Sequence, residues 1–297
     1  MLTLLKKIKN TLTHHIKNKS YRGYISFFTA QFLKWFLLIF LALFTLLPLI
    51  WIIISSFKTN MEIFTTAIAL PKAWQIQNYK NAFGLDGLLE AFRNTIFVSA
   101  ASTAMCVLIT SMAAYALRYK FRYKKQVYFF LIIGMYIPVN AFMIPYFTIS
   151  AFLKIYNTVW SLMLVYTAVG LPISILILKG YMDTIPNEIL ESARIDGCSF
   201  FKTYKKIMFP LSVPGIATVG VFQFISAWNE FLFATILTSN KGSRTLQVSI
   251  RYFMGTFVVD YASAFATMVI TLIPTIMIYI FFQERIIAGL TSGAVKG

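Results

Sequence analysis

Long uncharged stretches recur along the chain, separated by short segments in which lysine and arginine gather. A membrane-spanning helix needs about 20 consecutive, predominantly apolar residues. Five stretches between charged residues reach this length, and a sixth does so apart from one internal acid, Glu230. Their limits are 35–57, 94–117, 126–153, 155–178, 216–237 and 261–283. The pattern predicts an all-α integral membrane protein with six transmembrane helices.

The same pattern divides the chain into five parts. Residues 1–34 form a basic N-terminal segment, 35–57 the first transmembrane helix and 58–91 an external loop. We expect residues 92–283 to form a core with the other five helices, and 284–297 a C-terminal tail. The N-terminal region is not interpreted as a secretion signal, because no small-residue cleavage pattern follows a short apolar core. The first apolar stretch is therefore expected to act as an anchor.

Two of the expected helices carry residues suited to packing inside a bundle. The second contains a run of small residues, 99–104, spaced so that helix backbones can approach closely. The third contains Pro138, Asn140 and Pro145. Proline removes a backbone donor and bends a helix, so a kink is predicted there.

Composition excludes an ordinary soluble protein, since 58% of the residues are hydrophobic, 12% are charged and the mean hydropathy is +0.72. Basic residues concentrate in residues 1–34 and in the loops at 118–125 and 179–206. Cytoplasmic loops retain positive charge, so both termini are expected in the cytoplasm. The net charge of +17 is thus a topology signal, and no nucleic-acid partner is expected.

Sites for catalysis, metal ions or disulfides are not expected. His14 and His15 are adjacent and would point to different faces of a helix, and Cys106 and Cys198 lie in a membrane span and a cytoplasmic loop. No glycine-rich phosphate loop is found. The chain is therefore predicted to be no enzyme and to bind no cofactor, so any ATP and Mg²⁺ would be held by another protein.

The loop after the fourth span predicts two short helices joined by an elbow. Pro186 suits the first turn of one helix, and Gly197 can take the positive φ that ends it. Ser199 is a good cap for the second helix, which Pro210 and Pro214 are expected to end. Such a helix-turn-helix would form a knob that can enter a groove on a partner.

This loop resembles the EAA loop of binding-protein-dependent ABC permeases, in which Glu-Ala-Ala, three residues, Gly and nine residues precede Ile-x-Leu-Pro. The matching residues are Glu191, Ala193, Gly197, Ile207 and Pro210. Ser192 replaces the middle alanine, and Phe209 replaces the leucine. The resemblance implies that the loop couples to an ATPase subunit. The other residues that we expect in this contact are Ser192, Asp196, Phe200, Phe201 and Tyr204.

Residues 228–231, Trp-Asn-Glu-Phe, and the ending 289–297 resemble the carbohydrate-uptake branch of this family, in particular subunits similar to the maltose permease component MalG. Ser292 departs from the alanine common in that ending. The resemblance implies a permease subunit of an ATP-driven carbohydrate importer in a bacterial cell membrane, with an oligosaccharide as cargo. The implied partners are a second, MalF-like permease subunit, two ATPase subunits, an extracellular sugar-binding protein and membrane lipid.

The resemblance also implies roles for the tail and for part of the membrane region. The tail residues expected to contact the ATPases are Thr291, Gly293, Val295 and Lys296. We expect this tail to be too weakly helical to hold a shape alone. The candidates for lining the sugar pathway are Tyr136, Asn140, Gln223, Asn229 and Glu230. Of the long external loops, 58–93 and 239–261, the later one is expected to meet the binding protein.

Other functional classes remain as alternatives. A secondary transporter or channel would share the hydropathy and the basic inner loops, but it needs no docking knob, and Glu230 alone offers little for proton coupling. A permease of a non-sugar ABC importer would share the knob. A membrane scaffold would not need kinked spans. Uptake that requires a partner ATPase would separate an importer from the secondary transporter and the scaffold.

Overall fold

The computed structural model describes residues 21–84, 87–251 and 260–294 of the 297-residue chain, with side chains described for 30–84, 87–251 and 260–284. Every secondary-structure element in these ranges is a helix. The chain divides into two units, Met1–Ser55 and Ser56–Gly297. The all-α prediction is thereby confirmed.

The first unit contains α2 (Tyr21–Ser55). Its part from Ala30 to Ser55 is long and apolar enough to cross a membrane. The helix begins before the expected boundary at residue 35, so the basic segment is helical from Tyr21; residues 1–20 lie outside the described part. Four phenylalanines spaced four residues apart stack along one face, with ring centroids 6.2 to 6.5 Å apart. These are Phe32, Phe36, Phe40 and Phe44.

The second unit opens with two short helices, α3 (Asn60–Thr65) and α4 (Gln77–Gly84), before the long α5 (Leu88–Ala116). The next elements are α6 (Lys124–Ile132), the 3₁₀ turns η1 (Ile133–Tyr136) and η2 (Val139–Phe142), α7 (Met143–Phe152) and α8 (Val159–Met182). They are followed by α9 (Asn187–Ile195), α10 (Phe200–Thr203), the π-helix η3 (Tyr204–Met208), α11 (Phe209–Leu211) and α12 (Val213–Trp228). The last are α13 (Leu232–Leu237), η4 (Lys241–Ser243), α14 (Leu246–Ile250) and α15 (Tyr261–Ala294).

Four helices in the described part of the chain, α2, α5, α8 and α15, are each able to span a membrane by length and composition. Two bent pairs bring the number to six if each pair is one span. One pair joins Lys124–Tyr136 to Val139–Phe152 at 96°, and the other joins Phe200–Leu211 to Val213–Trp228 at 75°. The first bend falls at Ile137 and Pro138, where the backbone is extended, which confirms the predicted kink.

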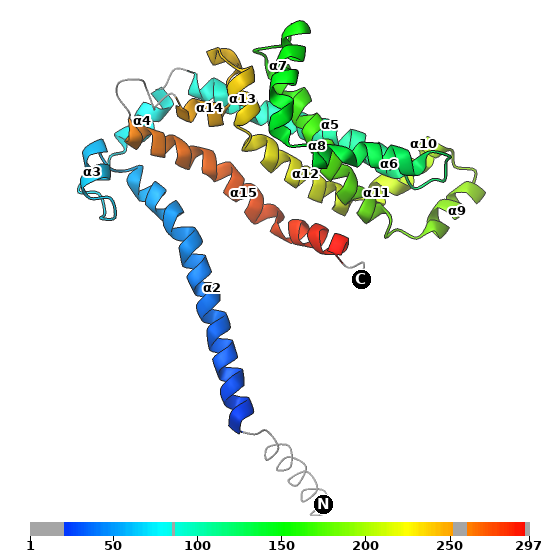
Figure 1. Cartoon of the computed structure of the whole chain (residues 1–297), viewed down its shortest axis with the longest axis horizontal. Helices are drawn as coiled ribbons and strands as arrows, with labels where there is room; N and C mark the ends of the chain where they lie inside the picture. The colour runs from blue at the N-terminus through cyan, green and yellow to red at the C-terminus, as the bar shows by residue number, and fades with distance from the viewer. Residues whose placement is uncertain (1–20, 85–86, 252–259, 295–297) are drawn as a thin grey trace, which may run out of the picture. The chain divides into compact units, whose positions relative to one another are not determined.

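The core of the second unit is formed where α5, α8 and α12 lie side by side, with α15 along α12 (Figure 1). Ser99 and Ser102, from the small-residue run of α5, are fully buried, and Thr167 of α8 donates a hydrogen bond to the carbonyl of Ser102 at 3.4 Å. Gly215 of α12 meets Tyr181 of α8 so closely that a Cβ would lie 2.6 Å from the ring. Small residues thus let these helices approach one another.

The expectation of one continuous helix over 216–237 is wrong. Helix α12 ends at Trp228, and α13 begins only at Leu232. Glu230 lies in the break, where its carboxylate accepts hydrogen bonds from the first amides of α13. A side chain that satisfies these amides allows a helix to start anew inside an apolar stretch.

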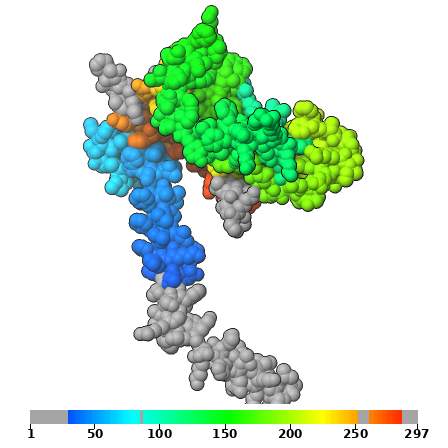
Figure 2. Space-filling model, turned by 45° about the vertical axis from the view of Figure 1, so that its right-hand side comes forward, coloured from blue at the N-terminus to red at the C-terminus, as the bar shows by residue number. Residues whose placement is uncertain are grey.

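The elbow segment, residues 187–211, projects from one end of the second unit (Figures 1 and 2). Gly197 has φ +70°, its N–H bonds the carbonyl of Arg194 at 3.0 Å, and the N–H of Cys198 bonds the carbonyl of Ala193 at 2.9 Å. This pattern is a Schellman motif, in which a glycine closes the helix. Ser199 caps α10 by accepting from the N–H of Lys202 at 3.4 Å. The predicted elbow and cap are therefore confirmed.

The second elbow helix ends at Leu211, between Pro210 and Pro214, as predicted. Pro210 is accommodated before this end because η3 widens to a π-turn in which the N–H of Phe209 bonds the carbonyl of Tyr204. The predicted end of the last helix is wrong. At the C-terminus, α15 continues to Ala294, so the expected weakly helical tail is helical that far. Only the helical backbone is described at Thr291 and Gly293, and Val295 and Lys296 lie outside the described residues.

Candidate functional site

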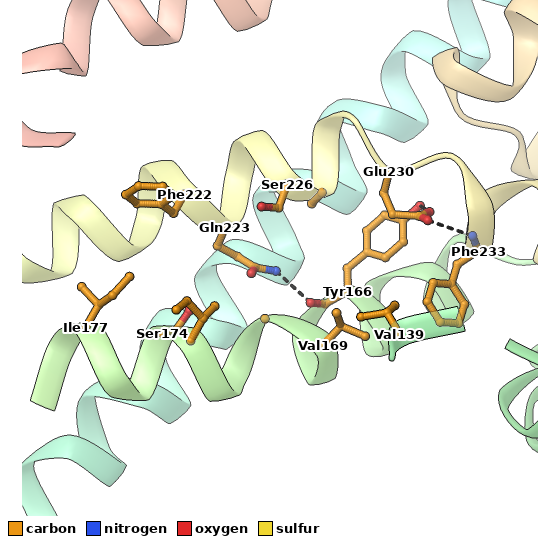
Figure 3. A pocket seen from close by; sticks show the side chains of 13 residues that line it. Val139, Tyr166, Val169, Ser174, Ile177, Phe222, Gln223, Ser226, Glu230 and Phe233 are labelled. Atoms are coloured by element: carbon orange, nitrogen blue, oxygen red, sulfur yellow. Dashed lines mark hydrogen bonds between the residues drawn. The ribbon is translucent and has the colours of Figure 1, made fainter. Parts of the chain in front are cut away.

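A cavity of about 290 Å³ lies between α8 and α12 (Figure 3). Val139, from the bent pair Lys124–Tyr136 and Val139–Phe152, closes it on one side. Most of its wall is apolar. Its polar side chains come from three places: Ser174 and Tyr166 on α8, Gln223 and Ser226 on α12, and Glu230 in the break after α12.

Gln223 bridges the two helices across the cavity wall. Its side chain is buried, and Nε2 donates to the backbone carbonyl of Tyr166 at 2.9 Å. The amide occupies the space beside Gly170, where an added Cβ would lie 1.8 Å from Gln223 Oε1. The absence of a side chain at residue 170 therefore makes this bridge possible.

Glu230 connects three elements at one end of the cavity. Its Oε1 accepts from the N–H of Phe233 at 2.8 Å, and Oε2 accepts from the N–H of Ala234 at 3.1 Å and from the hydroxyl of Tyr166 at 2.7 Å. The amides belong to the first turn of α13, where N–H groups have no partner within the helix. A carboxylate that receives three donors fixes the orientation of α13 relative to α8 and α12.

The structure brings together two of the five predicted pathway residues, Gln223 and Glu230. Asn229 is exposed and donates to the carbonyl of Ile225 at 3.0 Å, while Tyr136 and Asn140 are exposed at the bend and do not line the cavity. Sequence reasoning missed Tyr166, Gly170, Ser174 and Ser226. Tyr166 and Gly170 share a helix face at a spacing of four, but nothing in the sequence indicates that this face meets Gln223 and Glu230.

A second cavity of about 330 Å³ lies between α8 and the bent pair that contains Pro138. Its lining includes Gly134, Pro145 and Pro172, and it shares Val139 and Val169 with the first cavity. Two valine side chains thus stand between an apolar cavity and one that carries polar groups.

The elbow segment presents both charge and aromatic surface. Its exposed members among the predicted contact residues are Glu191, Ser192, Asp196, Gly197, Phe200, Phe201 and Pro210. Ala193 is buried, and Tyr204 and Ile207 are partly buried. The small Ala193 therefore packs inward while the acids on either side of it face outward.

Aromatic residues of α5 hold the second half of the elbow segment. The hydroxyl of Tyr115 donates to the carbonyl of Phe200 at 3.0 Å, and the rings of these residues lie 4.7 Å apart. Ser111 and Tyr204 share a hydrogen bond of 2.7 Å between their hydroxyls. The end of α5 is thus attached to α10 through Phe200 and to η3 through Tyr204.

Arg118 holds the first half of the elbow segment. Its Nη1 donates to the carbonyl of Met182 at 2.9 Å, and its Nη2 donates to the carbonyl of Ile185 at 2.7 Å and to Asn187 Oδ1 at 2.6 Å. Asp183 lies 3.6 Å from the same guanidinium. One nearly buried arginine therefore ties α5, the end of α8 and the start of α9 together.

The loop after α13, which the sequence predicts to be external, is also fixed to the helices, as far as it is described. Asn157 Oδ1 accepts from the N–H groups of Ser239 and Asn240 at 2.8 and 3.1 Å. Asn94 Nδ2 donates to the carbonyls of Gly242 and Arg244 at 2.9 and 3.0 Å. Hydrogen bonds from Asn94 and to Asn157 thus fix the position of residues 239–244.

Comparison with known proteins gives a consistent result. A family described as binding-protein-dependent transport system inner membrane component matches residues 106–291. The putative ABC transporter permease protein ORF2 of Caldicellulosiruptor sp. is 37% identical over 273 residues, which are 89% of this chain and 97% of that protein. The sulfoquinovosyl glycerol transport system permease protein SmoH of Agrobacterium fabrum is 34% identical over 277 residues, 93% of this chain and 97% of that protein. A crystal structure of a bacterial ABC transporter that imports the acidic polysaccharide alginate matches with a TM-score of 0.77 at 22% identity, over 89% of this chain and 98% of that one, which supports the fold.

Proposed function

Because this chain belongs to the family of binding-protein-dependent transport system inner membrane components, we propose that it is the permease subunit of an ATP-driven carbohydrate importer with an oligosaccharide as cargo. The observation that carries the proposal is a single family match, residues 106–291, that includes both the cavity and the elbow segment. The named cargo of SmoH, a glycoside, supports the carbohydrate class.

The proposed complex contains a second, MalF-like permease, two ATPase subunits and an extracellular sugar-binding protein. ATP and Mg²⁺ are bound by the ATPases, so this chain has no catalytic role and holds no cofactor. The family description, which names dependence on a binding protein, supports that partner. The basic residues of the loops at 118–125 and 179–206 support a cytoplasmic location for the elbow segment and both termini.

Coupling would proceed through the elbow segment. ATP binding closes the ATPase dimer and draws the elbow segments of the two permeases together, and hydrolysis releases them. The contacts of Arg118 and Tyr115 support this route, since they join the segment to α5 and α8. Nucleotide can shift the permease between inward and outward states only if the ATPase contacts differ between those states.

The cavity between α8 and α12 would form part of this chain's half of the pathway. Gln223 and Ser226 are candidates for touching the cargo, because both line the cavity with polar groups. Glu230 is assigned a structural role, since three donors already occupy its carboxylate. Tyr136, Asn140 and Asn229 remain candidates only if another conformation brings them into the pathway.

Transport assays test the proposal. A strain that lacks this chain should fail to take up one member of a panel of labelled oligosaccharides and glycosides, and the intact gene should restore uptake. Deleting the partner ATPase should abolish the same uptake. Uptake that persists without any ATPase and follows the proton gradient would support a secondary transporter, and rescue only of a non-sugar solute would overturn the carbohydrate assignment.

A further inference from the structure

We propose that residues 57–76, called here the platform segment, form an interfacial anchor whose apolar side chains enter the headgroup layer of the membrane. The segment follows directly after the first apolar helix in the sequence and contains α3. This inference does not rest on the proposed transport activity.

The platform segment exposes large apolar side chains to an unusual extent. Ile68 is 93% exposed, Leu70 67% and Trp74 61%, and three others are exposed to a similar degree. The three are Met61, Phe64 and Ile76. Soluble surfaces rarely gather so many large apolar groups, and such patches mark interaction sites. Figure 2 shows the segment, in light blue, at the surface.

Its own hydrogen bonds hold these side chains outward. Lys58 is fully buried, and its Nζ donates to the carbonyls of Thr66 and Ala67 at 2.8 and 2.9 Å. The backbone is closed further by the N–H of Gln75, which bonds the carbonyl of Phe57 at 2.9 Å. The apolar groups therefore project from a folded loop, and the loop has not collapsed around them.

Contacts with Asp260 and with the first residues of α15 fix the depth of the platform segment relative to the membrane. Asn60 donates to Asp260 at 3.2 Å and accepts from the N–H of Ala262 at 3.0 Å, and the ring of Phe64 lies 5.2 Å from that of Tyr261. The membrane-spanning part of α15 begins at Tyr261. The segment therefore lies where that span leaves the membrane, the level at which aromatic residues concentrate.

The charges of the segment favour the headgroup layer over the hydrocarbon. Glu62 caps α3 with Thr59, and the N–H groups of Thr59 and Lys72 hold the pKa of its carboxyl below the usual range. Lys72 is exposed. A lipid interface can receive tryptophan and isoleucine while these charges stay in water. Lipid surrounds a membrane span at the depth where it leaves the bilayer, so the position of the segment beside Tyr261 favours lipid as the occupant.

Nitroxide labels can test this placement. In a Cys106→Ala, Cys198→Ser background, Ile68→Cys and Leu70→Cys carry the probes, and Lys72→Cys in the same segment is the matched control. The chain is reconstituted in vesicles of phosphatidylcholine and phosphatidylglycerol, and collision with molecular oxygen is compared with collision with a water-soluble nickel chelate. We expect the oxygen-to-nickel ratio to be several-fold higher at residues 68 and 70 than at residue 72.

Two results would overturn the inference. Equally low ratios at all three positions would place the segment in water. Protection of residues 68 and 70 from both reagents would mean that protein covers them, either a second copy or another subunit. Because both side chains are exposed, the labels should not disturb folding, and the assay needs neither an ATPase nor transport.

Discussion

Gly197 is the residue on which the geometry of the elbow depends. It closes α9 at φ +70°, and an added Cβ would meet no atom within 4 Å. The cost of a side chain is therefore conformational, about 1 kcal/mol or more for a residue that disfavours this region. Asparagine tolerates the left-handed region, whereas a β-branched residue does not.

We expect Gly197→Val to remain in the membrane but to retain less ATPase on purification and to transport more slowly, with Gly197→Asn close to the native chain. Co-purification and uptake, each normalised to membrane abundance, measure both effects. Native uptake by a well-expressed valine variant would contradict the role assigned to this glycine.

Glu230 offers a second test at the scale of one side chain. Glu230→Gln leaves a single acceptor oxygen where three donors converge, and a buried group that loses its partner costs roughly 1 to 3 kcal/mol. Tyr166→Phe is the matched variant, because it removes one of the three donors and keeps the ring. Both should lower thermal stability and abundance, the first more than the second, while relative affinities for different sugars stay unchanged. A selective change in sugar affinity would instead assign Glu230 to the cargo.

At the scale of elements, the elbow segment is held by long-range contacts that can be weakened singly. Arg118 serves three acceptors through two nitrogens, and lysine keeps the charge but loses the planar fork. We expect Arg118→Lys to raise the ATP hydrolysed per sugar transported, because motion of α9 would reach α8 less completely. Arg122→Lys, an exposed arginine of the same loop, is the control. Equal loss of ATPase activity and transport in Arg118→Lys, together with low abundance, would point to misfolding.

The bend at Pro138 and the break at Glu230 differ in how far the sequence could predict them. Pro138 lies in an otherwise apolar stretch, so the first bend follows from backbone chemistry alone. The break at Glu230 depends on Tyr166, which is 64 residues away in the sequence, and on amides that any residues could supply. A lone acid in an apolar run therefore predicts only an interruption, whereas the Glu230 carboxylate accepts hydrogen bonds from the first turn of a new helix.

At the scale of the whole molecule, composition and charge spacing predicted an all-α membrane protein, and the motif residues predicted the family, which the comparisons confirmed. The cavity could not be predicted in the same way. Its walls form where Gly170 and Gln223, on different helices, approach within atomic contact, and only tertiary packing determines that pairing. Local chemistry thus predicted the elbow, whereas the candidate pathway required the structure.

The C-terminal ending leads to a prediction about the assembled transporter. Helix α15 continues to Ala294, so a helical extension carries the chain ten residues beyond Glu284, the acid that follows the predicted sixth span. From the resemblance of residues 289–297 to the endings of carbohydrate permeases, we predict that this extension reaches the ATPase interface. Thr291, Gly293, Val295 and Lys296 are the expected contacts. A helix that reaches a partner by extension, without having to fold on binding, loses little conformational entropy when it docks.

Crosslinking from Val295→Cys, in a Cys106→Ala, Cys198→Ser background, should therefore capture the ATPase subunits in the full complex, with a yield that changes between nucleotide-free and ATP-bound states. Lys72→Cys, in the predicted external loop, should give no such product. The nucleotide dependence is the informative part, because contacts that differ between states are what allow ATP to bias the permease. An absence of crosslinks, combined with unchanged ATPase activity and uptake after removal of residues 290–297, would leave the extension without a part in coupling and confine that function to the elbow segment.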